Sequence, residues 1–256
     1  MLDTARSLRE RLRKGESVFG PFSKTADPAF VEASGYAGFD FIILDMEHGP
    51  SNVTMLQDLI RAAEVAGIVP IVRVPLEMVS DIGRVLDIGA GGVQIPQITT
   101  AEQARAVLEV SRFAPRGQRG VCRFVRAAKY ATMDRYQYFA DANDALVILQ
   151  LEGGEALANL DGILAEPGID IIFIGPYDLS QSLGVPGQVE HPLVADKIEE
   201  IIHKCIAQGI AVGVFTDNGP ALEKWKKAGV QYLSYSVDVG LYAEYCKTLV
   251  EQYKNI

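Results

Sequence analysis

Cysteine and long apolar runs are scarce in this chain of 256 residues, and each scarcity excludes a class of protein. The three cysteines, Cys122, Cys205 and Cys246, are odd in number and form no CxxC pair. That pattern argues against a disulfide framework and fits a reducing compartment. The apolar runs, such as FIILD and IIFIG, are too short to cross a bilayer, and the first residues (MLDTARSLRERLRKGES) lack the apolar core of a signal peptide. We therefore expect a soluble, cytoplasmic protein.

An excess of basic residues is also absent. The chain has 24 basic and 33 acidic residues and a net charge of −9. No basic stripe is available to neutralise phosphates, so a nucleic-acid partner and an anionic membrane surface are both disfavoured. The hydrophobic fraction of 48% fits a globular protein with a full core, and the length suits one domain over residues 1–256.

Eight short apolar segments rich in β-branched residues alternate with helical patterns. Continuous apolar runs of this kind indicate strands that are covered on both faces. The predicted strands are residues 17–21, 39–44, 69–74, 92–95, 145–151, 169–174, 210–215 and 232–236. The predicted helices include residues 28–36, 52–66, 78–86, 101–113, 193–208 and 220–228. Gly67, Gly209 and Gly229 stand where a helix must end before the next strand.

This alternation over about 250 residues predicts an α/β fold, a (β/α)8 TIM barrel. The alternative is an open doubly wound sheet, but no GxGxxG follows the first strand, so a dinucleotide-binding fold is disfavoured. One segment, residues 115–143, breaks the rhythm between the fourth and fifth strands and carries five arginines. Long excursions of this kind are commonly functional or form interfaces.

Polar side chains follow the predicted strands, and the carboxyl ends of all strands in a barrel meet at one mouth. They are Asp45, Glu47, His48, Arg73, Gln150, Glu152, Tyr177, Asp178, Thr216, Asp217, Ser236 and Asp238, and Gly175 and Pro176 form the turn after the sixth strand. The opposite strand ends carry mostly Gly, Ala and Ile. This asymmetry predicts that the chemistry lies at the mouth.

Glu152 and Asp178 follow adjacent strands, and two ionised carboxylates ~4 Å apart repel by about 4 kcal/mol at an effective dielectric near 20. A bound cation removes that repulsion. Oxygen ligands without Cys or a His pair favour Mg²⁺ or Mn²⁺. The alternative is that both are solvated loop carboxylates.

Arg73 and His48 are the other candidates. Arg73 lies in the apolar run VPIVRVP, where an arginine needs an anion: a substrate carboxylate or enolate oxygen, or an internal pair with Asp45 or Glu47. His48 lies in an acidic turn and would be a usable base near neutral pH, or a structural histidine before the next helix. The turn after the sixth strand, Gly175 and Pro176, exposes backbone that can bind a carboxylate, a weak signal by itself.

Five sequence motifs follow one another along the chain and can be compared with known families as a set. They are LDMEHGP (44–50), IVRVP (71–75), the RG…RAAKY segment (119–130), QLEGGEAL (150–157) and FIGPYDLSQSLG (173–184). Together they resemble the 4-hydroxy-2-oxoheptanedioate aldolase/citrate lyase β-subunit family over nearly the whole chain. More narrowly, they resemble its short, pyruvate-dependent class II aldolase branch.

The resemblance implies a metal site at Glu152 and Asp178 that takes Mg²⁺ or Mn²⁺, and also Co²⁺. It implies that Arg73 binds the enolate and carboxylate of the substrate. It implies a histidine base at His48 and places the paired acid at Asp87.

The same resemblance implies that Asp45 lies near the arginine and the histidine and that Gln150 contacts pyruvate. The backbone at Gly175 and Pro176 matches the family's carboxylate cradle. It further implies a homo-oligomer, a hexamer built as a trimer of dimers, in which the helix over residues 239–253 is exchanged between subunits. The expected activity is that of a carbon–carbon lyase, which cleaves or forms 4-hydroxy-2-oxo acids or 2-keto-3-deoxy sugar acids through pyruvate and an aldehyde.

The chain departs from the family pattern at Cys122, Phe124 and Tyr177, which are bulkier than expected. In the family, the loop that carries Cys122 and Phe124 helps to shape the side of the pocket that takes the aldehyde. Three alternatives stay open: a Schiff-base aldolase using Lys24, a condensation or lyase reaction with an acyl donor on the same metal–enolate site, and a barrel without catalysis.

Overall fold

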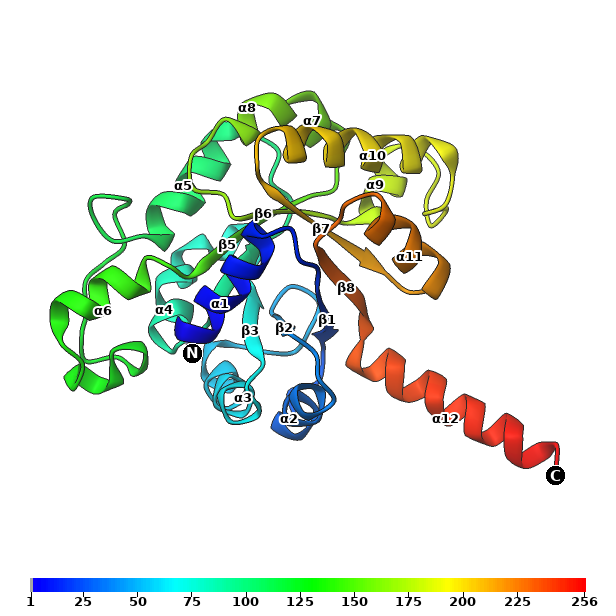
Figure 1. Cartoon of the computed structure of the whole chain (residues 1–256), viewed down its shortest axis with the longest axis horizontal. Coiled ribbons are helices and arrows are strands. Elements are labelled where there is room, and N and C mark those ends of the chain that lie inside the picture. Colours follow the sequence, from blue (N-terminus) through cyan, green and yellow to red (C-terminus); the bar gives the residue numbers. More distant parts are fainter. Residues whose placement is uncertain (1) are drawn as a thin grey trace.

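Eight apolar segments form the parallel strands of a closed barrel in the computed structural model, which describes residues 2–256 (Figure 1). The strands are β1 (Val18–Ser23), β2 (Phe41–Asp45), β3 (Val69–Arg73), β4 (Gly92–Ile95), β5 (Leu146–Leu151), β6 (Ile171–Ile174), β7 (Ala211–Thr216) and β8 (Tyr232–Val237). They are hydrogen-bonded in sequence order, and β8 closes on β1. The predicted (β/α)8 barrel is confirmed, with each strand within two residues of its predicted ends, and the open sheet is wrong.

Helices follow the strands and surround the barrel (Figure 1). The α-helices are α1 (Leu2–Arg13), α2 (Pro28–Tyr36), α3 (Val53–Ala66), α4 (Ile82–Asp87), α5 (Ala101–Ser111), α6 (Arg135–Ala142), α7 (Gly154–Ala158), α8 (Leu160–Leu164), α9 (Pro176–Ser182), α10 (Pro192–Ala207), α11 (Gly219–Lys227) and α12 (Asp238–Lys254). Two 3-10 helices are η1 (Leu76–Asp81) and η2 (Arg126–Ala131). The helix predicted over residues 78–86 is therefore η1 followed by α4. Asn52 caps α3 through its side chain, and Gly67 ends that helix with a φ of 73°.

The apolar core has two layers because strand side chains alternate between the two faces. Ile42, Leu44 and Val72 point outward and pack beneath the helices. Ile71, Phe41 and Tyr232 fill the barrel interior, where the last two rings stack with centroids 3.8 Å apart. The interior is therefore a packed core rather than a pore.

Strand register brings the polar residues of β2, β3 and β4 side by side. Asp45 is the Cα partner of Arg73, and Arg73 is the Cα partner of Gln94. Parallel pairing in register therefore aligns three buried polar side chains at one level of the barrel, where their hydrogen-bonding groups need partners.

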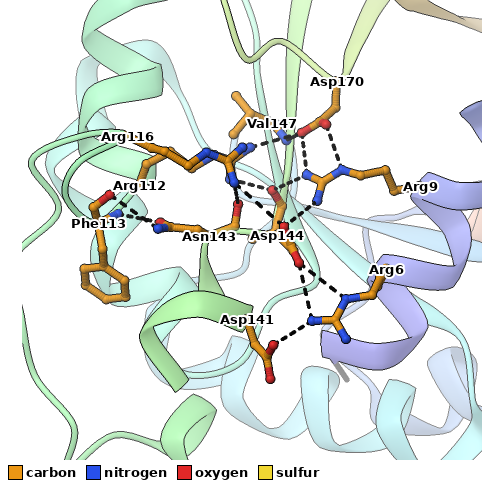
Figure 2. A network of polar contacts seen from close by, with 11 residues as sticks. Arg6, Arg9, Arg112, Phe113, Arg116, Asp141, Asn143, Asp144, Val147 and Asp170 are labelled. Carbon is orange, nitrogen blue, oxygen red and sulfur yellow. Dashed lines mark hydrogen bonds and ion pairs between the residues drawn. The ribbon is translucent and has the colours of Figure 1, made fainter. Parts of the chain in front are cut away.

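The amino-terminal end of the barrel is closed by α1 and a network of charged side chains (Figure 2). Asp170 accepts two hydrogen bonds of 2.8 Å from Arg9 and one of 3.1 Å from Arg112. Arg112 also donates to the carbonyl oxygen of Ala145. Asp144 lies near Arg6, which extends the network along α1.

Two parts of the chain project from the barrel (Figure 1). The excursion over residues 115–143 carries η2 and α6, and α12 points away from the barrel into solvent. Apolar side chains of α12 are exposed: Val239, Tyr242, Tyr245, Leu249, Val250 and Tyr253. None of the helices formed by residues 2–256 has the length and apolar character needed to cross a membrane.

Candidate active site

A cavity of about 270 Å³ opens at the carboxyl ends of the strands. It is lined by six of the predicted residues: His48, Arg73, Gln150, Gly175, Pro176 and Asp178. The other lining residues are Phe22, Lys24, Phe173, Tyr177, Phe215 and Val237. Strand ends far apart in sequence thus meet at one mouth, where charged groups and phenylalanine rings line the same cavity. The Arg73 guanidinium lies 4.8 Å from the centre of the Phe22 ring.

Arg73 is held in place by two carboxylates. Its Nε and Nη2 atoms donate to the two oxygens of Asp45 at 2.8 and 2.6 Å, and its Nη1 atom lies 2.9 Å from Glu47. Asp45 is fully buried; burial raises its pKa, but the hydrogen bonds and charge of Arg73 outweigh that effect and leave the pKa lowered. The internal ion pair that the sequence left open is therefore present. It fixes the guanidinium at the cavity wall.

Glu152 lies behind this wall, next to Gln150. The amide of Gln150 donates to one carboxylate oxygen of Glu152, and the backbone N–H of Gln97 donates to the other at 3.0 Å. Burial raises the pKa of Glu152 to about 7; Asp178 and Glu47 add to the rise, and these hydrogen bonds oppose it. A carboxyl group in this state gains a favourable partner when a cation arrives.

Oxygen donors for a hard cation lie at the cavity wall and behind it. Four carboxylates, Asp45, Glu47, Glu152 and Asp178, stand near only two cations, Arg73 and Lys24. Among residues 2–256, no group of three or more His, Cys, Asp or Glu side chains is placed to hold a metal. A site with two carboxylate ligands nevertheless suits Mg²⁺, which commonly keeps several waters and takes the rest of its ligands from substrate. The residues present therefore fit a divalent cation between Glu152 and Asp178.

Gly175 packs closely against the side chain of Glu152. A Cβ atom at this position would lie 2.7 Å from Glu152 Oε2. The N–H of Gly175 bonds to the carbonyl oxygen of Leu151 at 3.3 Å, and Pro176 has no N–H. The N–H groups of this turn that remain for a ligand are therefore those of Tyr177 and Asp178, in the first turn of α9.

His48 and Asp87 lie apart in the chain. The His48 side chain is 60% exposed at the mouth, with Nε2 3.9 Å from Glu47, and it does not cap α3, because Asn52 does. Asp87 ends α4, the helix that runs back to the amino-terminal side of the barrel, and its carboxylate accepts from Arg119 at 2.6 Å. Within one chain the structure does not bring these two residues together.

Two other residues near strand ends have structural partners. Asp238 accepts hydrogen bonds from the side chains of Ser23 and Thr25 and from the N–H groups of Lys24 and Thr25, at 2.6 to 3.0 Å. It fixes the loop after β1. Lys24 in this loop faces the cavity, with Nζ 3.9 Å from Asp45.

Sequence reasoning missed Gln94 and Gln97. Gln94 is fully buried, and its amide donates to Gln150 at 2.7 Å. The sequence could have identified Gln94, since it is the one polar side chain in the predicted strand GVQI. Gln97 has a φ of 58°, a left-handed conformation that directs its N–H to Glu152. No local pattern marks such a residue.

Comparison with known proteins places these residues in a family context. A family model described as HpcH/HpaI aldolase/citrate lyase matches residues 19–244. A 2-keto-3-deoxy-L-rhamnonate aldolase of Salmonella paratyphi B is 38% identical over 251 residues, which cover 97% of this chain and 93% of that protein. A hydroxypyruvate/pyruvate aldolase of Roseobacter denitrificans is 34% identical over 249 residues, 97% of each chain.

A solved structure of the citrate synthase SbnG is also similar. It is 32% identical with a TM-score of 0.87, over 96% of this chain and 97% of that one. The two curated relatives are aldolases, which are carbon–carbon lyases, as the sequence predicted. The chain belongs to the HpcH/HpaI aldolase/citrate lyase family.

Proposed function

We propose that this enzyme is a divalent-metal-dependent class II aldolase that cleaves or forms 4-hydroxy-2-oxo acids or 2-keto-3-deoxy sugar acids, with pyruvate as the shared product or donor. The observation that carries the proposal is the single cavity where Arg73, Gln150 and Asp178 meet beside Glu152. Its residue types suit a 2-oxo acid, because a cation and a preorganised guanidinium can share the charge of the enolate oxygen.

Glu152 and Asp178 would hold the metal. Members of the family generally depend on a divalent metal, and the all-oxygen donors favour Mg²⁺ or Mn²⁺, with Co²⁺ as a substitute. When bound, the cation supplies Lewis-acid polarisation of the oxo group, worth several kcal/mol of developing charge. Gln150 would contact pyruvate, and the free N–H groups after Gly175 and Pro176 would bind its carboxylate.

Arg73 would stabilise the enolate, with its orientation set before substrate arrives. Asp45 supports two of its three guanidinium nitrogens, so little rotamer freedom remains to be lost on binding. A fixed donor stabilises developing charge without reorganising during the reaction.

His48 would remove the proton from the C4 hydroxyl during cleavage, and Asp87 would orient it. Because Asp87 lies on the far side of its own barrel, this pairing requires Asp87 of a second copy. A mixture of His48→Ala and Asp87→Ala subunits tests it: hybrid assemblies would regain activity, because half of their sites combine one intact His48 with one intact Asp87. No gain on mixing would remove Asp87 from the mechanism.

Helix α12 supports a homo-oligomer. Val239, Tyr242, Leu249 and Tyr253 recur at intervals of three, seven and four residues and are exposed on a helix that leaves its own barrel (Figure 1). We propose the predicted hexamer, a trimer of dimers with exchanged α12 helices. Sedimentation of the full chain against Tyr242→Glu distinguishes a hexamer from a smaller species.

We also place the enzyme in the cytoplasm. Its three cysteines are free in the part of the chain that the structure describes, and Cys122 is exposed. Free exposed thiols persist where the compartment is reducing.

An enolate-type condensation or lyase reaction with an acyl donor is the second candidate. The similarity to the citrate synthase SbnG favours keeping it, because the enolate half of the site would be the same. Only the electrophile differs.

Proton NMR of pyruvate in D₂O with the protein tests the proposal without knowledge of the acceptor. We expect loss of the methyl signal with Mg²⁺ or Mn²⁺ and no loss when a chelator is present from the start. Absence of exchange under every metal would contradict pyruvate as the nucleophile. Condensation with an acyl donor would then be measured next.

A further inference from the structure

A second cavity lies beside the candidate active site. It has a volume of about 300 Å³ and lies between α10 and α11 at the same end of the barrel. Both cavities are lined by Pro176, Tyr177 and Phe215. These residues therefore form a wall with the reaction site on one side and an unassigned cavity on the other.

A side-chain hydrogen bond between two loops holds this wall in place and separates the two cavities. The Tyr177 hydroxyl, from the start of α9, donates to the carboxylate of Asp217, which follows β7. Asn218 donates to the other oxygen of Asp217 at 3.1 Å, and the Tyr177 and Phe215 ring centroids lie 6.2 Å apart. Tyr177 is 45% exposed, so its ring can swing away once the hydroxyl contact is broken.

The second cavity suits an uncharged chain. Phe215 and Trp225 contribute aromatic surface, and Thr216 and Glu190 contribute hydrogen-bonding groups. Its one cation, Lys224, lies 4.3 Å from the centre of the Trp225 ring and 3.5 Å from Glu199, so its charge is already balanced. A hydroxylated or aliphatic tail therefore fits this space better than a carboxylate does.

We propose that Tyr177 is a specificity-determining residue that restricts the acceptor to short aldehydes, of two or three carbons, by closing the second cavity to the tail of a longer one. This inference rests on the proposed aldolase function. The site cavity holds roughly nine volumes of a water molecule at about 30 Å³ each, which is room for pyruvate and a short aldehyde. A longer chain would need the space behind Tyr177.

The test measures kcat/KM for addition of pyruvate to glycolaldehyde and propanal as short acceptors, and to erythrose and hexanal as long ones. In Tyr177→Ala we expect the ratio of kcat/KM for long acceptors to kcat/KM for short acceptors to rise at least tenfold. This lies within the range known for one or more methylenes in a pocket. Tyr177→Phe keeps the ring, so its ratio should rise less. Ala221 lines only the second cavity, so Ala221→Leu in the Tyr177→Ala background should abolish the gain.

Pyruvate methyl exchange in D₂O separates two kinds of failure. If Tyr177→Ala exchanges pyruvate protons like the parent and its ratio stays unchanged, Tyr177 does not limit the acceptor. If the gain survives Ala221→Leu, the long tail lies elsewhere and the second cavity is not its site. If the parent exchanges no pyruvate protons under any metal, the proposed function fails first. Tyr177→Thr, which keeps a hydroxyl but not the ring, gives the same comparison should the alanine variant fold poorly.

Discussion

The two ends of this barrel both carry buried charge, yet their charges are arranged in opposite ways. At the amino-terminal end, Arg9 and Arg112 meet Asp170, and each arginine also donates one hydrogen bond to the carbonyl oxygen of Ala145 (Figure 2). At the carboxyl end, four carboxylates face Arg73 and Lys24. At the first end the protein itself pairs the acidic with the basic groups, whereas at the second end the acidic groups outnumber the basic ones.

The difference shows which buried charges serve stability and which serve function. A buried pair with every partner present costs little to keep, whereas uncompensated buried carboxylates raise one another's pKa and oppose folding. Burial raises the pKa of Glu152 to about 7, and the nearby carboxylates Asp178 and Glu47 add to the rise. Strain of this kind at a mouth lined by polar groups is typical of a functional site. Substitutions at the two ends should therefore change different measured quantities.

The largest effect on stability is expected at the amino-terminal end. Asp170→Ala leaves Arg9 and Arg112 buried without their carboxylate, and breaking such a network costs about 3–5 kcal/mol. Denaturant unfolding measures the loss. The matched control is Asp161→Ala, whose pair with Lys204 is 79% exposed on the acid side and should change stability by less than about 0.5 kcal/mol. Equal effects of the two variants would show that the network of Figure 2 does not hold the barrel end.

Arg73→Lys should lower kcat/KM by about 10²–10³, some 2.7–4 kcal/mol, with the fold retained. Lysine keeps the charge that the buried Asp45 needs but loses the two-pronged geometry. Arg73→Ala is a poorer test, since it would also strand Asp45 in the interior. Steady-state kinetics alongside thermal unfolding separates the two effects. Full turnover by Arg73→Lys would show that the guanidinium does not act on the substrate.

Glu152→Gln should stabilise the metal-free protein while abolishing metal binding. The folded-state pKa of Glu152 is raised above its ordinary value of 4.5 to about 7. Between these values the folded state binds more protons than the unfolded state, so the unfolding free energy falls as pH rises from about 5 to about 8. At about 1.4 kcal/mol per pKa unit, the titration of Glu152 should lower the unfolding free energy over this pH range by on the order of 2–3 kcal/mol.

Unfolding of both proteins at pH 5 and pH 8 with a chelator measures this difference. The parent should weaken relative to Glu152→Gln as pH rises, and saturating Mn²⁺ at pH 8 should restore the parent only. A parent that gains stability over this range relative to the variant would contradict the assignment.

The barrel could be predicted from the sequence because each strand is a local pattern. The run FIILD and the Gly67 turn carry their structures within a few residues. The position of Arg73 at the mouth also follows from its strand. Its pairing with Asp45 was only one of two options, because a pair between strands depends on register, which no single segment encodes.

The contacts behind the mouth were harder to predict. The left-handed backbone of Gln97 and the Tyr177–Asp217 contact join segments whose sequences give no sign of each other. Asp87 shows the same limit: the resemblance pairs it with His48, whereas within this chain its carboxylate accepts from Arg119. What the sequence specifies locally is predictable, and what depends on packing between segments needs coordinates.

The smallest effect is expected for substitution of Gln94, a buried polar residue at the carboxyl end of the barrel. It donates to Gln150, which donates to Glu152, so a chain of amides fixes which end of Gln150 faces the carboxylate. The carbonyl oxygen of Gln94 has no hydrogen-bond partner, so Gln94→Leu removes a buried unpaired atom as well as a donor.

Thermal stability of Gln94→Leu should therefore change little. The Mn²⁺ dissociation constant should rise about tenfold, as when a ligand loses its supporting hydrogen bond. Calorimetric titration with Mn²⁺ measures it. If Gln94 served only the barrel core, the variant would unfold more easily and bind Mn²⁺ as before, and this glutamine would belong with the structural charges of the opposite end.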